Sequence, residues 1–231
     1  MSGTGGLAGP FLALEASTLR PSVALLGPAG ERWGQWMQAQ GQRGTAPLAP
    51  AIAELLAARG TSVAALAGVV VGLGPGSYTG TRAAIALARG LVFGSGAPLA
   101  GVPSVAAAAR AELAARPQLE RVVVLVDARR GERYRADYAR APAGPAAGSG
   151  LVEVQPPRLV SAAEPDPLDG AAISVLREPI PCAYDVGAVG MERLLAGGDA
   201  PVAVRPLYLK RSHAEIVFDE RVGPAGPSGL G

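Results

Sequence analysis

The chain of 231 residues is long enough for one large domain or two small lobes, and with 49% hydrophobic but only 4% aromatic residues its core must consist mainly of Ala, Val and Leu. Its formal net charge of +2 is compatible with contact to RNA but small for this length, so we interpret it as an ordinary basic surface. The single cysteine, Cys182, excludes an internal disulfide and a cysteine-rich zinc site, and the single histidine, His213, excludes a metal site with two histidines.

The sequence contains no membrane or export signal that we can identify. No stretch approaches the roughly 20 uninterrupted apolar residues that a membrane helix needs, so we expect a soluble protein with no membrane partner. Residues 1–9 lack the basic start and apolar run of a secretory signal. These residues and residues 219–231 are predicted to be flexible tails, and the scarcity of cysteine fits a cytoplasmic location.

The first part of the chain predicts a strand meander followed by a helix. Residues 11–15 and 23–26 are expected to pair, and residues 31–37 continue the meander across a Gly-Pro-Ala-Gly turn. Pro47 fits the first turn of a helix, and Gly60 ends it. Between them, apolar side chains recur at helical spacing at Leu48, Ile52, Leu55 and Leu56.

The most informative stretch, residues 69–91, predicts a buried strand, a glycine turn and a helix. Three consecutive valines form the strand, and Ser77 or Thr79 caps the helix. A Walker loop is excluded because the only lysine is Lys210, far from this turn, and the dinucleotide fingerprint has glycine where Ser77 stands. We therefore favour a structural connection over a phosphate-binding loop. The residues of this signature turn are Gly74, Pro75, Gly76, Ser77, Thr79 and Gly80.

The helix after the signature turn is apolar nearly all round, with Arg82 and Arg89 as its main interruptions. Such a helix is ordinarily buried on several sides. One side must pack on its own sheet. The other is covered either by the protein's own helix from Pro47 or by a helix of another chain, and the sequence alone does not decide between them.

The rest of the chain predicts a second, smaller lobe. Residues 99–102 form a strand, Ser104 caps a helix that ends before Pro117, and residues 121–127 and 133–138 form a hairpin. A strand at 151–155 and a helix at 183–196 follow, whereas the proline-interrupted stretch 156–181 predicts no element. This is an α/β chain with lobes at 10–116 and 117–215.

The hairpin turn carries a local concentration of arginines. Arg129, Arg130 and Arg133, together with Arg135, are candidates for contact with RNA phosphate, since alternate side chains of a strand share a face. The alternative is a solvated turn that Glu132 and Asp137 partly neutralise.

Four segments in the same order resemble the TsaB (YeaZ) family. They are Leu-Ala-Leu-Glu-Ala-Ser-Thr at 12–18, the signature stretch at 69–91, Val-Asp-Ala-Arg-Arg-Gly-Glu-Arg-Tyr at 126–134, and Pro-Leu-Tyr-Leu-Lys-Arg at 206–211. The resemblance implies a two-lobed, actin-like, ribonuclease-H-like fold. Residues 40–45 lack the His-Ser or His-Thr pair that commonly precedes the first helix in relatives.

The resemblance also implies a function. TsaB is a non-catalytic subunit that pairs with TsaD, the enzyme that transfers a threonylcarbamoyl group to the adenosine next to the anticodon of ANN-decoding transfer RNAs. The ATPase TsaE binds the pair, TsaB alone forms a homodimer, and its contact with transfer RNA is indirect or auxiliary. We expect no cofactor, metal or catalytic residue here. The expected partner-binding residues are Leu48, Ile52, Leu55, Arg82, Ile85, Ala86 and Arg89.

Two other functions stay open. An actin-like nucleotide-binding enzyme of the kinase or ATPase type would use Glu15, Ser17 and Thr18, which occupy the positions of a vestigial nucleotide site. Glu15 is one methylene longer than the aspartate usual there, which places its oxygens differently. A peptidase of the glycoprotease type is the other alternative, but one histidine leaves it little chemistry.

Overall fold

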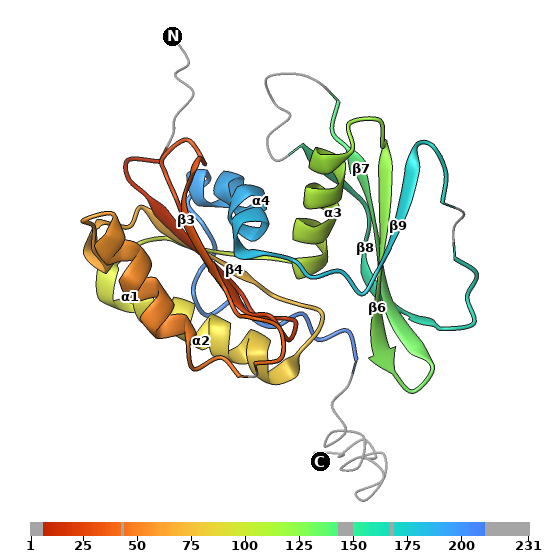
Figure 1. The fold of residues 1–231 in the computed structure, drawn as a ribbon, viewed down its shortest axis with the longest axis horizontal. Helices are drawn as coiled ribbons and strands as arrows, with labels where there is room; N and C mark the ends of the chain where they lie inside the picture. Colours follow the sequence, from red (N-terminus) through yellow and green to blue (C-terminus); the bar gives the residue numbers. More distant parts are fainter. Residues whose placement is uncertain (1–6, 43, 143–149, 167–168, 211–231) are drawn as a thin grey trace, which may run out of the picture.

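The computed structural model describes residues 7–42, 44–142, 150–166 and 169–210. These residues form two β-sheets and four α-helices, stacked as helices, sheet, helices and sheet (Figure 1). Within this part of the chain, no helix is both long enough and apolar enough to cross a lipid bilayer.

The first sheet contains the five strands expected in the N-terminal half. They are β1 (Phe11–Glu15), β2 (Ser22–Leu26), β3 (Arg32–Met37), β4 (Gly68–Gly72) and β5 (Leu99–Val102). Their order in the sheet is β3-β2-β1-β4-β5, in which β1, β2 and β3 form the predicted antiparallel meander and β1, β4 and β5 run parallel. Every residue of β1, β2, β4 and β5 is buried, because helices cover both faces of the sheet.

Helices α1 (Leu48–Ala58) and α2 (Tyr78–Ser95) cover one face of this sheet, and α4 (Ala183–Leu195) covers the other (Figure 1). A short 3-10 turn, η1 (Val63–Ala65), precedes β4. Helix α4 lies very close to the sheet at Gly190, where an added Cβ would be 2.2 Å from Cγ1 of Val70. Helix α4, which belongs to the predicted C-terminal lobe, thus completes the core of the first sheet.

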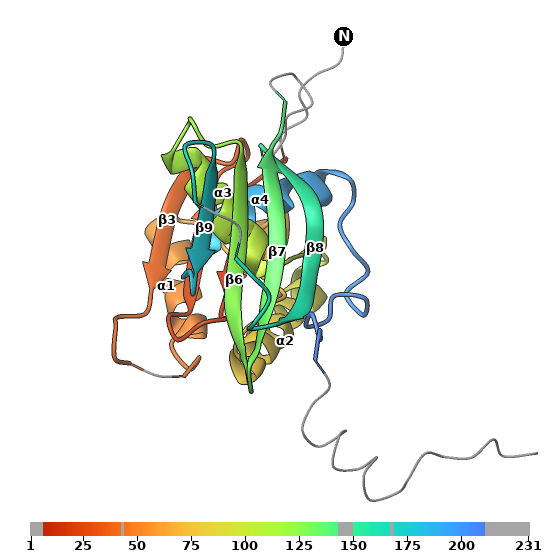
Figure 2. The same ribbon diagram turned by 90° about the vertical axis from the view of Figure 1, so that its right-hand side faces the viewer.

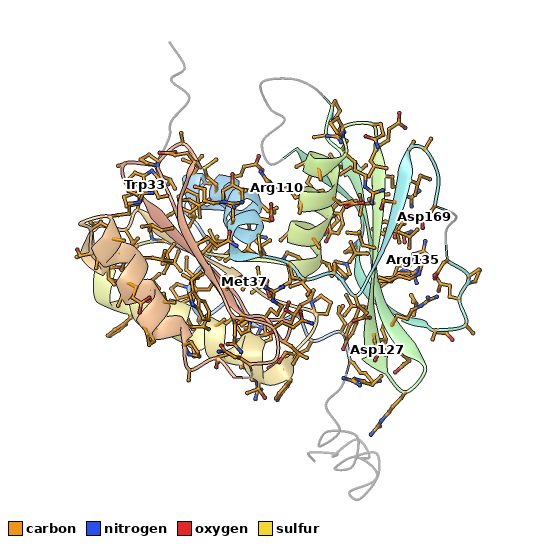
Figure 3. The ribbon with its side chains drawn as sticks, viewed as in Figure 1. Trp33, Met37, Arg110, Asp127, Arg135 and Asp169 are labelled. Carbon is orange, nitrogen blue, oxygen red and sulfur yellow. The ribbon has the colours of Figure 1, made fainter. Side chains whose placement is uncertain are left out.

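The second sheet contains β6 (Arg121–Arg129), β7 (Glu132–Arg140), β8 (Leu151–Ser161) and β9 (Ile173–Arg177), in the order β8-β7-β6-β9. Helix α3 (Ser104–Ala115) lies between this sheet and α4 (Figures 1 and 2). Arg110 of α3 and Asp185 of α4 are joined by an ion pair of 2.6 Å at this junction (Figure 3).

The prediction that residues 156–181 contain no element was wrong in two places. Strand β8 continues through Pro156 and Pro157 to Ser161, which is possible because β8 is an edge strand and needs ladder hydrogen bonds on one side only. The five residues of β9 then pair in parallel with β6. Such a short strand, whose partner lies about 50 residues earlier, has little local signal.

Candidate functional site at the junction of the two sheets

The signature turn joins β4 to α2 and packs directly on the turn between β1 and β2. Ser77 caps α2, because its Oγ accepts a hydrogen bond from the Gly80 N–H at 3.2 Å, and its own N–H donates to the Ser17 carbonyl at 2.6 Å. Of the two predicted caps, Ser77 therefore fills the role and Thr79 does not. A Cβ on Gly76 would be 2.1 Å from the Ser17 carbonyl oxygen. Glycine is required here because two backbones approach closely.

Glu15 lies beneath this turn and is fully buried. Its Oε1 accepts a hydrogen bond from the Ser17 N–H at 2.5 Å, and its carboxyl group fills the space above Gly72, where an added Cβ would be 2.0 Å from Oε2. Burial raises the pKa of Glu15 above its ordinary value, although the nearby Ser104 and Ser17 hydroxyls oppose the shift. The carboxyl group therefore supports the turn from below.

Ser104 has a different role from the predicted one. Pro103 occupies the N-cap position of α3, and Ser104 is the first residue of the helix. Its Oγ accepts a hydrogen bond from the Gly74 N–H at 3.0 Å, and its N–H donates to the Gly74 carbonyl at 2.7 Å. This reciprocal pair of hydrogen bonds holds the start of α3 against the signature turn. The Ser104 hydroxyl is therefore engaged by Gly74 and does not cap the helix.

A cleft of about 580 Å³ opens between the signature turn and the second sheet. Ser17, Thr18 and Ser77 line one wall, and Asp127, Arg129 and Glu178 line the other. Glu15 does not line this cleft, so the structure brings together only two of the three predicted nucleotide-site residues at its surface. The Glu178 carboxylate accepts a hydrogen bond from the Asp127 N–H. The lining of the cleft therefore contains both carboxylates, of Asp127 and Glu178, and guanidinium groups, of Arg20 and Arg129.

Residues 206–210, the closing segment, connect the two sheets. The Leu207 N–H donates to the Leu73 carbonyl at 2.8 Å, next to the signature turn. Lys210 reaches the hairpin between β6 and β7, where its Nζ lies 2.5 Å from Oε2 of Glu132 and 3.2 Å from the Ala128 carbonyl. The segment therefore links α2 and the signature turn to the second sheet.

The seven predicted partner-binding residues divide into three groups. Leu48, Ile52 and Ile85 are at most 3% exposed and belong to the protein's own core, so their side chains are not available to a partner. The guanidinium groups of Arg82 and Arg89 bind the C-terminal part of the chain, Arg82 at the Tyr208 hydroxyl and Arg89 at the Val204 carbonyl, both at 2.6 Å. Leu55 is half-buried and Ala86 is exposed.

The residue that sequence reasoning missed on α2 is Phe93, which is 94% exposed. Ala86, Gly90 and Phe93 are all exposed and recur at spacings of four and three residues, which places them on one side of the helix. Helical periodicity contained this signal, because an apolar helix with one uncovered side must expose some apolar residues. The sequence alone did not identify which side that is.

The predicted arginine cluster is separated in the structure. Arg129 and Arg130 lie in the hairpin turn and are exposed, both with positive φ. Arg133 instead forms an ion pair with Asp166 at 2.6 Å and donates to the Glu164 carbonyl. Figure 3 shows Asp127 near the tip of the hairpin and Arg135 on the outer side of the second sheet, where Arg135 pairs with Asp137 and Glu164.

Metal-ligating residues do not gather among the residues that the structure describes: no group of three or more His, Cys, Asp or Glu side chains could hold an ion there. His213 and the end of the Pro-Leu-Tyr-Leu-Lys-Arg motif lie outside the described residues, as do most of the two predicted tails. Cys182 donates a hydrogen bond to Oδ2 of Asp185 at 2.8 Å. Burial and this carboxylate raise the pKa of the thiol to about 11.

Comparison with known proteins agrees with this architecture. Residues 43–155 match the family model described as TsaD, tRNA N6-adenosine threonylcarbamoyltransferase. The chain is 37% identical over 130 residues to the tRNA threonylcarbamoyladenosine biosynthesis protein TsaB of Haemophilus influenzae. This alignment covers 56% of this chain and 54% of that protein. It is 31% identical over 177 residues to an uncharacterized protein of Mycobacterium tuberculosis, and this alignment covers 73% of this chain and 75% of that protein.

The structure of YeaZ from Pseudomonas aeruginosa superimposes with a TM-score of 0.73 at 24% identity, covering 87% of this chain and all of that one. The predicted α/β fold class is thereby confirmed, and the chain shares the fold of YeaZ. The chain belongs to the TsaB/YeaZ family. Its alignments span about half the length of the curated TsaB relatives that it matches.

Proposed function

We propose that this chain acts in the biosynthesis of threonylcarbamoyladenosine in transfer RNA, as a non-catalytic subunit that binds TsaD and keeps it in its active arrangement. The naming of the curated TsaB relatives supports the pathway. The match to a TsaD family model supports common ancestry with the transferase, its proposed partner. By this proposal TsaE binds the resulting pair, and the chain forms a homodimer when TsaD is absent. Its contact with transfer RNA is indirect or auxiliary.

The observation that carries the proposal is the uncovered outer side of α2. The first sheet lies on the inner side of α1 and α2 (Figure 1), and on the outer side of α2 the hydrogen bonds of the chain's own C-terminal part are made by Arg82 and Arg89, to residues 202–208. Ala86 and Gly90 leave room for a second helix to approach closely, and Phe93 offers a large apolar side chain that is 94% exposed. A partner subunit would bury this side chain, which is a common anchor at protein interfaces.

The sequence chemistry supports a non-catalytic role. A metal centre with two histidine ligands requires two histidines, and the sequence has one. The predicted kinase-type alternative would use the carboxylate of Glu15, but Glu15 is fully buried and its Oε1 accepts a hydrogen bond from the Ser17 N–H. TsaD would then supply the reacting groups, and this chain would contribute by stabilising one conformation of TsaD.

The proposal is tested by measuring the mass of the complex with the cognate TsaD by light scattering. We expect Phe93→Asp and Ala86→Arg to abolish or strongly weaken assembly, because each places a charge in the proposed interface. Val154→Asp is the matched control, since Val154 is an exposed apolar residue on the edge strand β8 of the other sheet. Equal assembly by all three variants, each folded by circular dichroism, would contradict the α2 interface.

A further inference from the structure

A second cavity, of about 480 Å³, lies beside the closing segment and gathers an unusual share of the aromatic residues. Three of the five tyrosines in the sequence line it: Tyr78 at the start of α2, Tyr134 on β7 and Tyr208 in the closing segment. Its other polar side chains are the hydroxyl groups of Ser77 and Thr81 and the cationic groups of Arg82 and Lys210. This volume lies within the range of small-molecule sites.

Two of the tyrosine rings are available to a ligand. The rings of Tyr78 and Tyr208 have centroids 5.8 Å apart and planes tilted by 36°, and the two side chains are 50% and 53% exposed. Half-exposed rings that meet at a cavity offer flat apolar surface without the cost of burying a polar group. Nucleobases stack on such rings, which is the usual way in which proteins hold an unpaired base.

Arg82 provides the charge at this cavity. Its Cζ lies 4.2 Å from the centre of the Tyr78 ring and 5.6 Å from that of Tyr208, and its Nε donates to the Tyr208 hydroxyl at 2.6 Å. No carboxylate of the described chain forms an ion pair with Arg82, whereas Lys210 is neutralised by Glu132. The guanidinium therefore keeps its orientation through the tyrosines and keeps its charge for an anion.

From this arrangement we propose that the cavity binds a nucleotide, with the base against the Tyr208 ring and a phosphate at the outer edge of Arg82. The site adjoins the cleft that contains Ser17 and Thr18, since Pro75, Gly76, Ser77 and Tyr134 line both, but Tyr78, Arg82 and Tyr208 line only this cavity. A free nucleotide and a nucleotide within RNA share this chemistry. The inference concerns the isolated chain and does not depend on assembly with TsaD.

The test is equilibrium dialysis of the full-length chain, without TsaD, against labelled AMP and labelled adenosine. We expect one saturable AMP site. Arg82→Gln should weaken AMP by about tenfold or more and adenosine by less than about twofold, because only AMP has the charge that the guanidinium binds. Tyr208→Leu should weaken both ligands by about tenfold through the loss of stacking, and Tyr208→Phe should retain most of the affinity.

Arg59→Gln is the control, since Arg59 also lies over an aromatic ring, that of Trp33, but far from the cavity. Absence of saturable AMP binding at millimolar concentration would overturn the proposal, as would Arg82→Gln and Tyr208→Leu variants that bind AMP as tightly as Arg59→Gln. Competition by unmodified transfer RNA identifies the source of the ligand. Displacement of AMP assigns the site to an RNA nucleotide, and undiminished AMP binding assigns it to a free one.

Discussion

The Lys210 ammonium lies 2.5 Å from the Glu132 carboxylate, and this ion pair fixes the closing segment to the hairpin of the second sheet. The same ammonium donates to the carbonyl groups of Ala128 and Arg129 at 3.2 and 3.3 Å. Three acceptors thus surround the only lysine of the sequence. Since the Leu207 N–H donates a hydrogen bond to the Leu73 carbonyl beside the signature turn, the segment connects the two sheets, and its residues line the tyrosine cavity.

This relationship predicts the rate at which endoproteinase Lys-C cuts the chain. The enzyme has a single target, Lys210, whose ammonium must leave its three acceptors before cleavage. We expect Glu132→Gln to accelerate the cut by up to about fivefold, because a partly exposed ion pair contributes at most about 1 kcal/mol. Glu31→Gln, a change at an exposed carboxylate in the turn between β2 and β3, should leave the rate unchanged. Equal rates for both variants would show that the ion pair does not hold the segment.

Glu15 predicts a specific dependence of stability on pH. Its pKa is raised in the folded state by burial, so the native protein holds this proton more tightly than the unfolded chain does. The resulting stabilisation is complete below the unfolded pKa of 4.5 and is lost as the pH rises through the folded pKa. Glu15→Gln lacks this titration. The free energy of unfolding of the wild type, measured in urea, should therefore fall relative to that of Glu15→Gln as the pH rises. A difference that stays constant with pH would contradict the buried, protonated carboxyl group.

Two glycines within helices predict effects of opposite sign. An added Cβ at Gly190 would meet Cγ1 of Val70 at 2.2 Å, whereas none of the surrounding atoms lies within 4 Å of a Cβ at Gly94 in α2. We expect Gly190→Ala to destabilise the protein by about 1–3 kcal/mol through overpacking. Gly94→Ala should stabilise it by about 0.5–1 kcal/mol, because alanine loses less backbone entropy in a helix. Urea unfolding of both variants measures these changes, and a stabilising Gly190→Ala would show that α4 does not approach the sheet so closely.

Cys182 should react slowly with alkylating agents. Its pKa of about 11, against an ordinary value of 9.0, leaves about a hundredfold less thiolate at neutral pH. The rate with iodoacetamide should keep rising well above pH 9, and Asp185→Asn should accelerate the reaction at pH 8 by removing the carboxylate that accepts the thiol proton. The unfolded protein in urea is the reference for an unperturbed thiol. A native rate equal to that reference would contradict the hydrogen bond.

Much of the first lobe was predictable because its elements carry strong local signals. The runs of Val and Leu in β1, β2 and β4 are buried on both faces, which gives continuous apolar segments bounded by turn residues. The glycine turn before α2 was recognisable from its residue types. Its reason was not, because the close approach to Ser17 depends on a segment about 60 residues earlier.

The tyrosine cavity and the outer side of α2 could not be predicted from the sequence. Tyr78, Tyr134 and Tyr208 are far apart in the chain and meet only because the closing segment returns to α2. Likewise, periodicity marked α2 as apolar on all sides, but only the position of the sheet separates buried Ile85 from exposed Ala86 and Phe93. These are tertiary facts, which no local pattern encodes.

The most direct test of the proposed function is reconstituted threonylcarbamoyl transfer with the cognate TsaD, TsaE, threonylcarbamoyl-adenylate and an ANN-decoding transfer RNA. Modified adenosine is measured by mass spectrometry with and without this chain, and with its Phe93→Asp variant. We predict product only when the wild-type chain is present and a large loss with the variant, because TsaD would lack the subunit that holds it active. Equal product without the chain would contradict the account.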